Sequence, residues 1–149
     1  MEDKNPKSTA SIAGHPIHPM LVPFPIVFFV STLVTDIVYA QTADPMWATA
    51  STWLLGAGLV MAALAAVVGL IDFAGERRIR ELRPAWLHMI GNVAAVLFSL
   101  VNFLVHSGNI PAGVIPYGLA LSAIVALLLL FNGWMGWELV YKHRVGVAD

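Results

Sequence analysis

Four apolar segments dominate the sequence, and short polar stretches separate them. They run approximately over residues 20–40, 50–73, 86–106 and 116–141. A helix needs about 20 mostly apolar residues to cross the hydrocarbon core of a bilayer. The pattern therefore predicts four transmembrane helices in an all-α protein.

The connections between these segments are short, so consecutive helices should lie side by side and run in opposite directions. This predicts an up-down-up-down four-helix transmembrane bundle, in which the first and third spans face each other diagonally. We expect residues 1–13 to form a polar tail and residues 14–149 to form one membrane domain.

The composition supports a membrane location and excludes several classes of function. The chain is 58% hydrophobic and 11% charged, with a mean hydropathy of +0.78, whereas soluble domains are about 45–50% apolar and about 25% charged. It has no cysteine, which excludes disulfides, iron–sulfur ligation, thiolate zinc sites and covalent c-type haem. No basic cluster with interleaved aromatic residues points to nucleic acid.

The distribution of basic residues predicts an orientation. All eight Lys and Arg residues lie in the tail 1–13, in the connection 74–85 or in the segment 142–149, and none lies in the connections 41–49 and 107–115. Basic residues mark cytoplasmic segments of membrane proteins. We therefore expect a protein of the bacterial inner membrane, surrounded by lipid, with both termini in the cytoplasm.

Small and polar residues at helical spacing predict the packed faces of the spans, because such residues mark helix–helix interfaces in lipid. The clearest stripe lies on the third span: His88, Asn92, Ala95, Ser99, Asn102 and His106. The first span is less regular, with Thr32, Asp36 and Tyr39 on one side, and Glu138 falls roughly opposite the small-residue stripe Gly118–Gly136 of the fourth span. Asp36 lies near the far interface, where we expect it to cap its helix or reach the interface, and Glu138 is expected to reach the cytoplasmic interface.

Four of the five histidines fall at the cytoplasmic end of the predicted bundle: His15, His18, His88 and His143. Asp72 reaches the same level at the end of the second span. The fifth histidine, His106, is about 27 Å from His88 at 1.5 Å per residue. Each of His15 and His18 precedes a proline, which disfavours helix, so residues 14–25 are expected to be extended or a broken first turn.

Two kinds of metal centre suit this arrangement. Haem iron can take two axial imidazoles from helices that face each other across a bundle. His18 and His88 open the diagonal spans and suit a haem b site, where Asn92 would bond to the edge of the cofactor. A non-haem site would instead use several of the four histidines, with the carboxylates of Asp72 and Glu138 adding charge.

Four quoted segments carry a family resemblance: "GHPIHPMLVPFPI" at 14–26, "GLIDF" at 69–73, "HMIGN" at 88–92 and "GWELVYKHRVGV" at 136–147. They resemble the bacterial membrane family called domain of unknown function 2231, over the whole chain after residue 12. The usual closing motif of that family resembles "GGELVYRHGVGV", so Trp137 and Arg144 here add bulk and charge near His143.

The resemblance implies no established activity. The plan of the family is similar to that of small b-type cytochrome membrane domains, and some members are joined to redox domains, which implies electron transfer with a redox partner protein. By motif match, a shared function would use the following residues: His15, His18, Asp72, His88, Asn92, Glu138 and His143. His106 is not part of the pattern.

Three hypotheses therefore remain open from the sequence. The first is a haem protein that transfers electrons on the cytoplasmic side. The second is a non-catalytic membrane scaffold or subunit of a larger complex, and the third is a non-haem metal site or a proton-handling site. The sequence contains no glycine-rich phosphate loop and no serine elbow that would indicate an enzyme.

Overall fold

The computed structural model describes residues 5–109 and 113–147. Residues 1–4 of the predicted tail, 110–112 of the last connection and 148–149 lie outside the described residues. In chain order the elements are β1 (Ser11–Ile12), β2 (His15–Pro16), α1 (Ile17–Leu21), α2 (Pro23–Thr42), α3 (Pro45–Gly75), α4 (Arg77–Arg80), α5 (Arg83–His106), η1 (Val114–Gly118), α6 (Leu119–Trp137) and η2 (Glu138–Lys142).

Within the described residues, four helical spans are long and apolar enough to cross a membrane, which confirms the predicted all-α class. They cover Ile17–Thr42, Pro45–Gly75, Arg83–His106 and Val114–Lys142. Most of their ends extend a few residues beyond the apolar segments, because helix boundaries depend on capping as well as hydropathy. For example, the Asp44 carboxylate accepts a hydrogen bond from the backbone N–H of Met46 at 2.9 Å and caps the start of α3.

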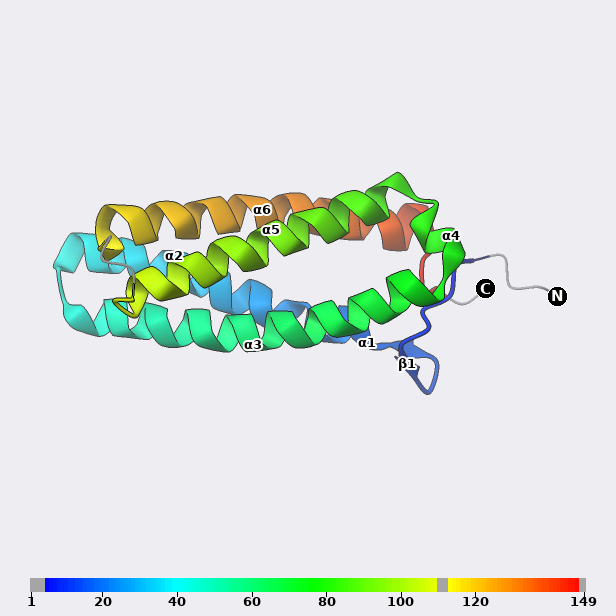
Figure 1. Cartoon of the computed structure of the whole chain (residues 1–149), viewed down its shortest axis with the longest axis horizontal. Coiled ribbons are helices and arrows are strands. Elements are labelled where there is room, and N and C mark those ends of the chain that lie inside the picture. Colours follow the sequence, from blue (N-terminus) through cyan, green and yellow to red (C-terminus); the bar gives the residue numbers. More distant parts are fainter. Residues whose placement is uncertain (1–4, 110–112, 148–149) are drawn as a thin grey trace.

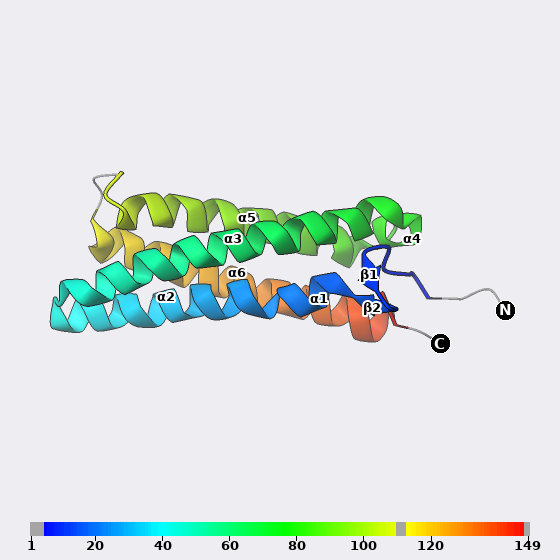
Figure 2. The ribbon, with the colours of Figure 1, turned by 90° about the horizontal axis from the view of Figure 1, so that it is seen from below.

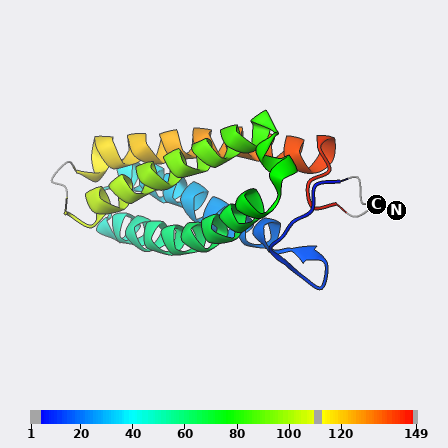
Figure 3. The ribbon, with the colours of Figure 1, turned by 45° about the vertical axis from the view of Figure 1, so that its right-hand side comes forward.

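The spans lie along one long axis, with the connections at its two ends (Figure 1). The largest helix contacts are α2 with α3, α5 with α6, α3 with α5, and α2 with α6. Helices α2 and α5 therefore face each other diagonally, as expected for the first and third spans. A view from below shows α1 continuing the line of α2 (Figure 2). The chain begins and finishes at the end that carries α4 (Figure 3).

The proline-rich entry to the first span is more helical than the sequence predicts. Only the short β1–β2 hairpin is extended, with Ser11 opposite Pro16, and helix begins at Ile17. Pro19 and Pro23 occupy the first turns of α1 and α2, where a proline removes no helical hydrogen bond. Of the two expectations for residues 14–25, the extended backbone holds only for the short strand His15–Pro16, whereas a broken first turn matches the interruption at Val22 between α1 and α2.

The bundle is apolar outside and polar at many positions inside. Trp53 is 78% exposed and Leu130 is 73% exposed, as befits side chains that face lipid. Eight buried polar residues lie on the four long helices: Thr32, Thr35, Asp36, Ser51, Ser99, Asn102, Ser122 and Asn132. The predicted stripe on the third span is largely confirmed, since Ala95, Ser99 and Asn102 are buried.

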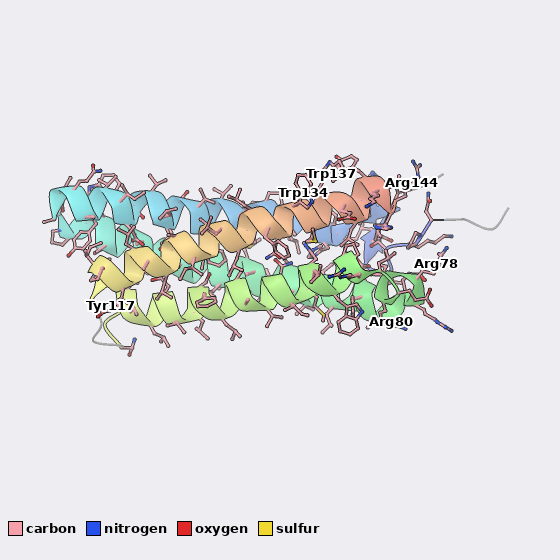
Figure 4. The ribbon with its side chains drawn as sticks, turned by 90° about the horizontal axis from the view of Figure 1, so that it is seen from above. Arg78, Arg80, Tyr117, Trp134, Trp137 and Arg144 are labelled. Atoms are coloured by element: carbon pink, nitrogen blue, oxygen red, sulfur yellow. The ribbon has the colours of Figure 1, made fainter. Side chains whose placement is uncertain are left out.

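An apolar cluster of Phe29, Leu55, Ala62 and Val125 joins α2, α3 and α6. Val96 and Phe103 of α5 pack against this cluster. Arginine side chains mark the end of the bundle that holds the termini: Figure 4 shows Arg78, Arg80 and Arg144 there and Tyr117 at the opposite end. The two ends thus differ in charge, and each holds its own group of polar residues.

Candidate functional site

His18 of α1 and His88 of α5 face each other at the end of the bundle that carries the termini. Their ring centroids are 6.2 Å apart and their planes are nearly perpendicular, at 85°. Both residues are partly buried. The prediction that these two imidazoles meet across the bundle is therefore confirmed.

Each of the two rings is held by one hydrogen bond to a neighbouring helix. His18 Nδ1 lies 2.8 Å from the carbonyl oxygen of Ala65 on α3, and His88 Nδ1 lies 3.0 Å from that of Asn132 on α6. A carbonyl oxygen only accepts hydrogen bonds, so both Nδ1 atoms carry the proton. In the neutral ring each Nε2 then has a free lone pair, and neither Nε2 makes a hydrogen bond within the described part of the chain.

Glycines create the space that the two rings occupy. A Cβ atom on Gly69 would lie 2.9 Å from His18 Nδ1 and Cε1, and one on Gly136 would lie 3.3 Å from His88 Cε1. Real Cβ contacts are rarely this short, so any larger residue would displace the ring. The glycines therefore let each imidazole lie directly on the backbone of its neighbouring helix.

The two halves of the chain repeat this arrangement. In the first half, His18 bonds to Ala65 and lies over Gly69. In the second half, His88 bonds to Asn132 and its ring lies beside Gly136. In both, the glycine follows the acceptor residue by four positions, one helical turn. The paired imidazoles thus belong to two equivalent units, each built from one histidine helix and one glycine helix.

The other predicted ligands at this end have different partners. Asn92 donates from Nδ2 to the carbonyl oxygen of His88 at 2.8 Å, within its own helix. His15 is exposed and bonds through Nδ1 to the carbonyl of Ala13 at 3.0 Å. Over residues 5–109 and 113–147, no three His, Asp or Glu side chains come together as a metal-binding group. The described structure therefore brings together two of the four histidines, His18 and His88.

Asp72 binds the N-terminal tail. Its carboxylate accepts hydrogen bonds from the hydroxyl of Ser8 at 2.9 and 3.1 Å, from the hydroxyl of Thr9 at 3.3 Å and from the backbone N–H of Ala10 at 2.7 Å. The backbone N–H of Gly146 donates to the carbonyl of Pro6 at 2.8 Å. The tail therefore packs on the end of the bundle and also contacts the C-terminal segment.

Glu138 and His143 form a separate pair close to the end of the fourth span. Lys142 Nζ lies 2.7 Å from Glu138 Oε1, and His143 Nε2 lies 3.8 Å from the same oxygen. The Glu138 side chain is only 18% exposed, so it lies against the bundle while its carboxylate meets Lys142. This geometry makes Glu138 a local partner of the basic residues that follow it.

A second polar cluster, at the opposite end of the bundle, centres on Asp36 and His106. His106 Nε2 lies 2.9 Å from Asp36 Oδ1, and both side chains are fully buried. The expectation that Asp36 caps its helix or reaches the interface was therefore wrong. A carboxylate can stay inside a bundle when charged and hydroxyl partners satisfy it, and here the fold supplies them.

Asp36 is hydrogen-bonded to all three other long helices. Ser51 of α3 donates to Oδ1 at 2.5 Å, Ser122 of α6 donates to Oδ2 at 2.6 Å, and His106 of α5 completes the set. Sequence reasoning missed this cluster because the four residues come from four spans. The signal present in the sequence was that all four are polar residues in apolar segments, and that His106 belongs to the stripe predicted on the third span.

Comparison with protein-family models identifies the fold's relatives. The model of a family of predicted membrane proteins, DUF2231, matches residues 14–149. The chain belongs to the DUF2231 family. No curated protein and no solved structure matches the chain.

The segments that carry the DUF2231 resemblance gather around the His18–His88 pair and the tail. The opening segment contains His18, "GLIDF" contains Gly69 and Asp72, "HMIGN" contains His88, and the closing segment contains Gly136. Asp36 and His106 lie outside all four segments. Within these segments, His18, Gly69, His88 and Gly136 therefore belong to the paired imidazoles, and Asp72 holds the tail.

Proposed function

We propose that this DUF2231 protein binds haem b between His18 and His88 and transfers electrons at the cytoplasmic face of the bacterial inner membrane. The two facing imidazoles, each with a free Nε2, are the observation that carries the proposal. A redox protein on the cytoplasmic side would be the electron partner.

The separation of the rings fits a shared metal. Metal–imidazole nitrogen bonds are about 2.0–2.1 Å long, so two imidazoles on opposite sides of one metal have centroids about 6 Å apart. The observed separation is 6.2 Å. The perpendicular planes are compatible with this, because rotation about the metal–nitrogen axis changes no bond length.

The surroundings of both rings match those of metal-binding histidines. A histidine ligand usually donates its second ring N–H to a carbonyl or carboxylate, which fixes the tautomer and the orientation of the ring. Here the carbonyls of Ala65 and Asn132 have that role, and Gly69 and Gly136 keep each ring against its helix. Haem bound at this site would supply one-electron redox chemistry, while the protein supplies the ligands and a low-dielectric environment.

The basic end of the molecule supports the proposed orientation. Arg78, Arg80 and Arg144 lie at the same end as both termini (Figure 4), and basic residues favour the cytoplasmic side. A haem at this end would lie within short range of a partner docked on the basic surface. The proposal therefore places donor or acceptor proteins in the cytoplasm.

An absorption spectrum of the purified protein tests the proposal. The full chain is expressed with an ample haem supply and purified in detergent, and we expect a Soret band that shifts on reduction. His18→Ala and His88→Ala should each abolish the low-spin spectrum. The matched control is His15→Ala, at the same end of the bundle but exposed and bonded only to Ala13, which should leave the spectrum unchanged.

A colourless wild-type protein would contradict haem binding. Two aromatic rings in direct edge-to-face contact also have centroids about 4.5–7 Å apart, and a colourless, metal-free protein would identify the pair as such a contact. Elemental analysis of the same sample distinguishes the remaining case, a non-haem metal ion on the same two histidines. Reporter fusions at the C-terminus and in the connection 41–49 test the orientation, with a cytoplasmic signal expected only from the C-terminus.

A further inference from the structure

The Asp36–His106 cluster is the most completely buried group of titratable side chains in the described structure. Asp36, Ser51 and Asn102 have no exposed surface, Ser122 is 2% exposed, and the His106 side chain is fully buried. Charged groups inside a membrane-spanning bundle are costly and are usually retained for a function. The proposed haem site lies at the other end and does not use this cluster.

The donor and acceptor roles in the hydrogen bonds indicate how many protons the cluster holds. His106 Nδ1 donates to the carbonyl oxygen of Asn102 at 3.0 Å, and Asn102 Nδ2 donates to Ser122 Oγ at 2.8 Å. Ser122 therefore directs its own proton to Asp36. Ser51 also lies 2.7 Å from the Thr35 hydroxyl, and it donates to Asp36 at 2.5 Å when Thr35 donates to Ser51. The 2.9 Å contact between His106 Nε2 and Asp36 Oδ1 needs one further proton, which either atom can carry.

We propose that Asp36 and His106 form a proton-binding site that exchanges protons with the aqueous side opposite the chain termini. With one proton between them the pair is either a neutral acid beside a neutral imidazole or an ion pair, and its net charge is zero in both cases. Uptake of a second proton gives imidazolium beside carboxylic acid and a net charge of +1. Each exchange transfers one proton and changes no other bond.

Few other titratable groups lie near the pair. The elements packed around it at this end are α2, α3, α5, η1 and α6, and their remaining titratable side chains there are Tyr39, Asp44 and Tyr117. Asp44 is exposed and caps α3, while Tyr117 is 59% exposed. None of the three makes a hydrogen bond to the pair in the described structure, so the titratable partner of Asp36 there is His106, and that of His106 is Asp36.

The position of the pair favours access from one side. His106 is the last residue of α5, and Asp36 lies six residues before the end of α2, about 9 Å at 1.5 Å per residue. Two fully buried atoms beside the cluster, Asn102 Oδ1 and Ser99 Oγ, have no hydrogen-bond partner. Buried polar atoms of this kind usually bind ordered water, which would carry protons to the pair.

Deeper in the bundle, beyond the Asp36–His106 pair, the interior is filled by the apolar cluster that contains Phe29, Leu55 and Val125. On α5 the next buried residues beyond Ser99 are Ala95 and Gly91, which offer no polar side chain. The apolar cluster thus separates the Asp36–His106 pair from the buried amide of Asn132, which lies against Gly91 near His88. Proton exchange is expected at the connection end and not through the full length of the bundle.

A difference titration tests the proposal. Wild-type protein and the Asp36→Asn/His106→Gln double variant are titrated in the same nanodiscs over the whole pH range in which circular dichroism shows both to be folded. We expect the wild type to take up about one more proton per chain. Equal uptake would overturn the proposal and leave the pair as a purely structural contact.

A control variant and two further measurements support the titration. Asp44→Asn removes an exposed carboxylate at the same end and should not change the difference between wild type and the double variant. If the double variant does not fold, by circular dichroism, ¹⁵N signals of His106 in the wild type give the answer alone. One step in the Nε2 signal over the same pH range supports the site, and a constant signal overturns it. The absorption spectrum of Asp36→Asn should equal that of the wild type, which separates this proposal from haem binding.

Discussion

At the end that carries both termini, His18 and His88 each donate one hydrogen bond to a helix carbonyl and keep Nε2 without a partner. At the opposite end, both nitrogens of His106 are engaged, Nδ1 by a carbonyl and Nε2 by Asp36. The backbone anchoring of Nδ1 is common to all three rings. The difference lies in what Nε2 meets.

Each histidine also lies beside a glycine. A Cβ on Gly118 would lie 2.7 Å from His106 Cε1, as one on Gly69 would lie 2.9 Å from His18. The same packing thus occurs at both ends, while Nε2 differs: in the described structure it has no hydrogen-bond partner at the proposed haem site, and it meets Asp36 at the proposed proton-binding site. In this bundle, the partner of Nε2 therefore distinguishes the histidines better than the partner of Nδ1 does.

The largest effect is expected from removing Asp36. Asp36→Ala leaves His106 and two serine hydroxyls without their shared partner, and breaking a buried charged pair typically costs about 3–5 kcal/mol. His18→Ala removes one neutral hydrogen bond, worth about 0.5–1.5 kcal/mol. Unfolding in mixed micelles with increasing SDS measures both. Equal losses of stability would show that the two ends do not differ as described.

Ser51 and Ser99 offer a matched pair of buried hydroxyls. Ser51→Ala removes a hydrogen bond to the Asp36 carboxylate, and bonds to charged groups contribute about 1.5–3 kcal/mol. Ser99 Oγ has no partner among the described residues, so Ser99→Ala should cost less stability than Ser51→Ala. The same unfolding measurement distinguishes them, and a larger loss for Ser99→Ala would contradict the proposed hydrogen-bond network.

Gly69→Ala tests the packing of His18. The added Cβ would lie 2.9 Å from the ring, and overpacking of this kind costs about 1–3 kcal/mol. The spectrum expected for bound haem should weaken at the same time, because the ring is displaced. Gly133→Ala is the matched control, since no atom lies within 4 Å of its added Cβ. An unchanged spectrum in Gly69→Ala would show that the position of His18 does not matter for binding.

Asp72→Ala should release the N-terminal tail and leave the rest of the bundle intact. The variant loses the hydrogen bonds from Ser8, Thr9 and Ala10, so amide hydrogen exchange of residues 5–12 should become faster. The spectrum should stay unchanged, because Asp72 is a partner of the tail and not a ligand in our proposal. Loss of the spectrum would instead place Asp72 in the cofactor site.

The smallest effect concerns the pH dependence of the same region. Hydrogen bonds from Arg78 lower the pKa of Glu76 from 4.5 to about 2, and the backbone N–H of Lys7 also donates to this carboxylate. A lowered folded-state pKa stabilises the structure above pH 4.5, and this contribution is lost as the pH falls toward 2. Solvent screening keeps the effect small. The protection factors of the tail amides, which are corrected for the intrinsic pH dependence of exchange, should therefore fall slightly over this range in the wild type and stay constant in Glu76→Gln.

Much of the fold follows from the sequence. The four apolar segments are long enough to span a bilayer, and the short connections bring consecutive spans together, so the all-α bundle and the diagonal placement of α2 and α5 were predictable. The meeting of His18 and His88 followed from the same reasoning, because both residues open diagonal spans at one level. Helix starts were less predictable, since prolines such as Pro19 and Pro23 fit in first turns.

Hydropathy and residue spacing therefore determined the number of spans, their inward faces and the depth of each histidine, because these depend on positions along one helix. Only the tertiary structure decided the partners of Asp36, Asp72 and His106. Hydrogen bonds between residues as distant in sequence as Asp36 and Ser122 depend on how four helices are rotated about their axes. Single-helix periodicity leaves those rotations free, and the packing of side chains such as His18 on Gly69 selects them.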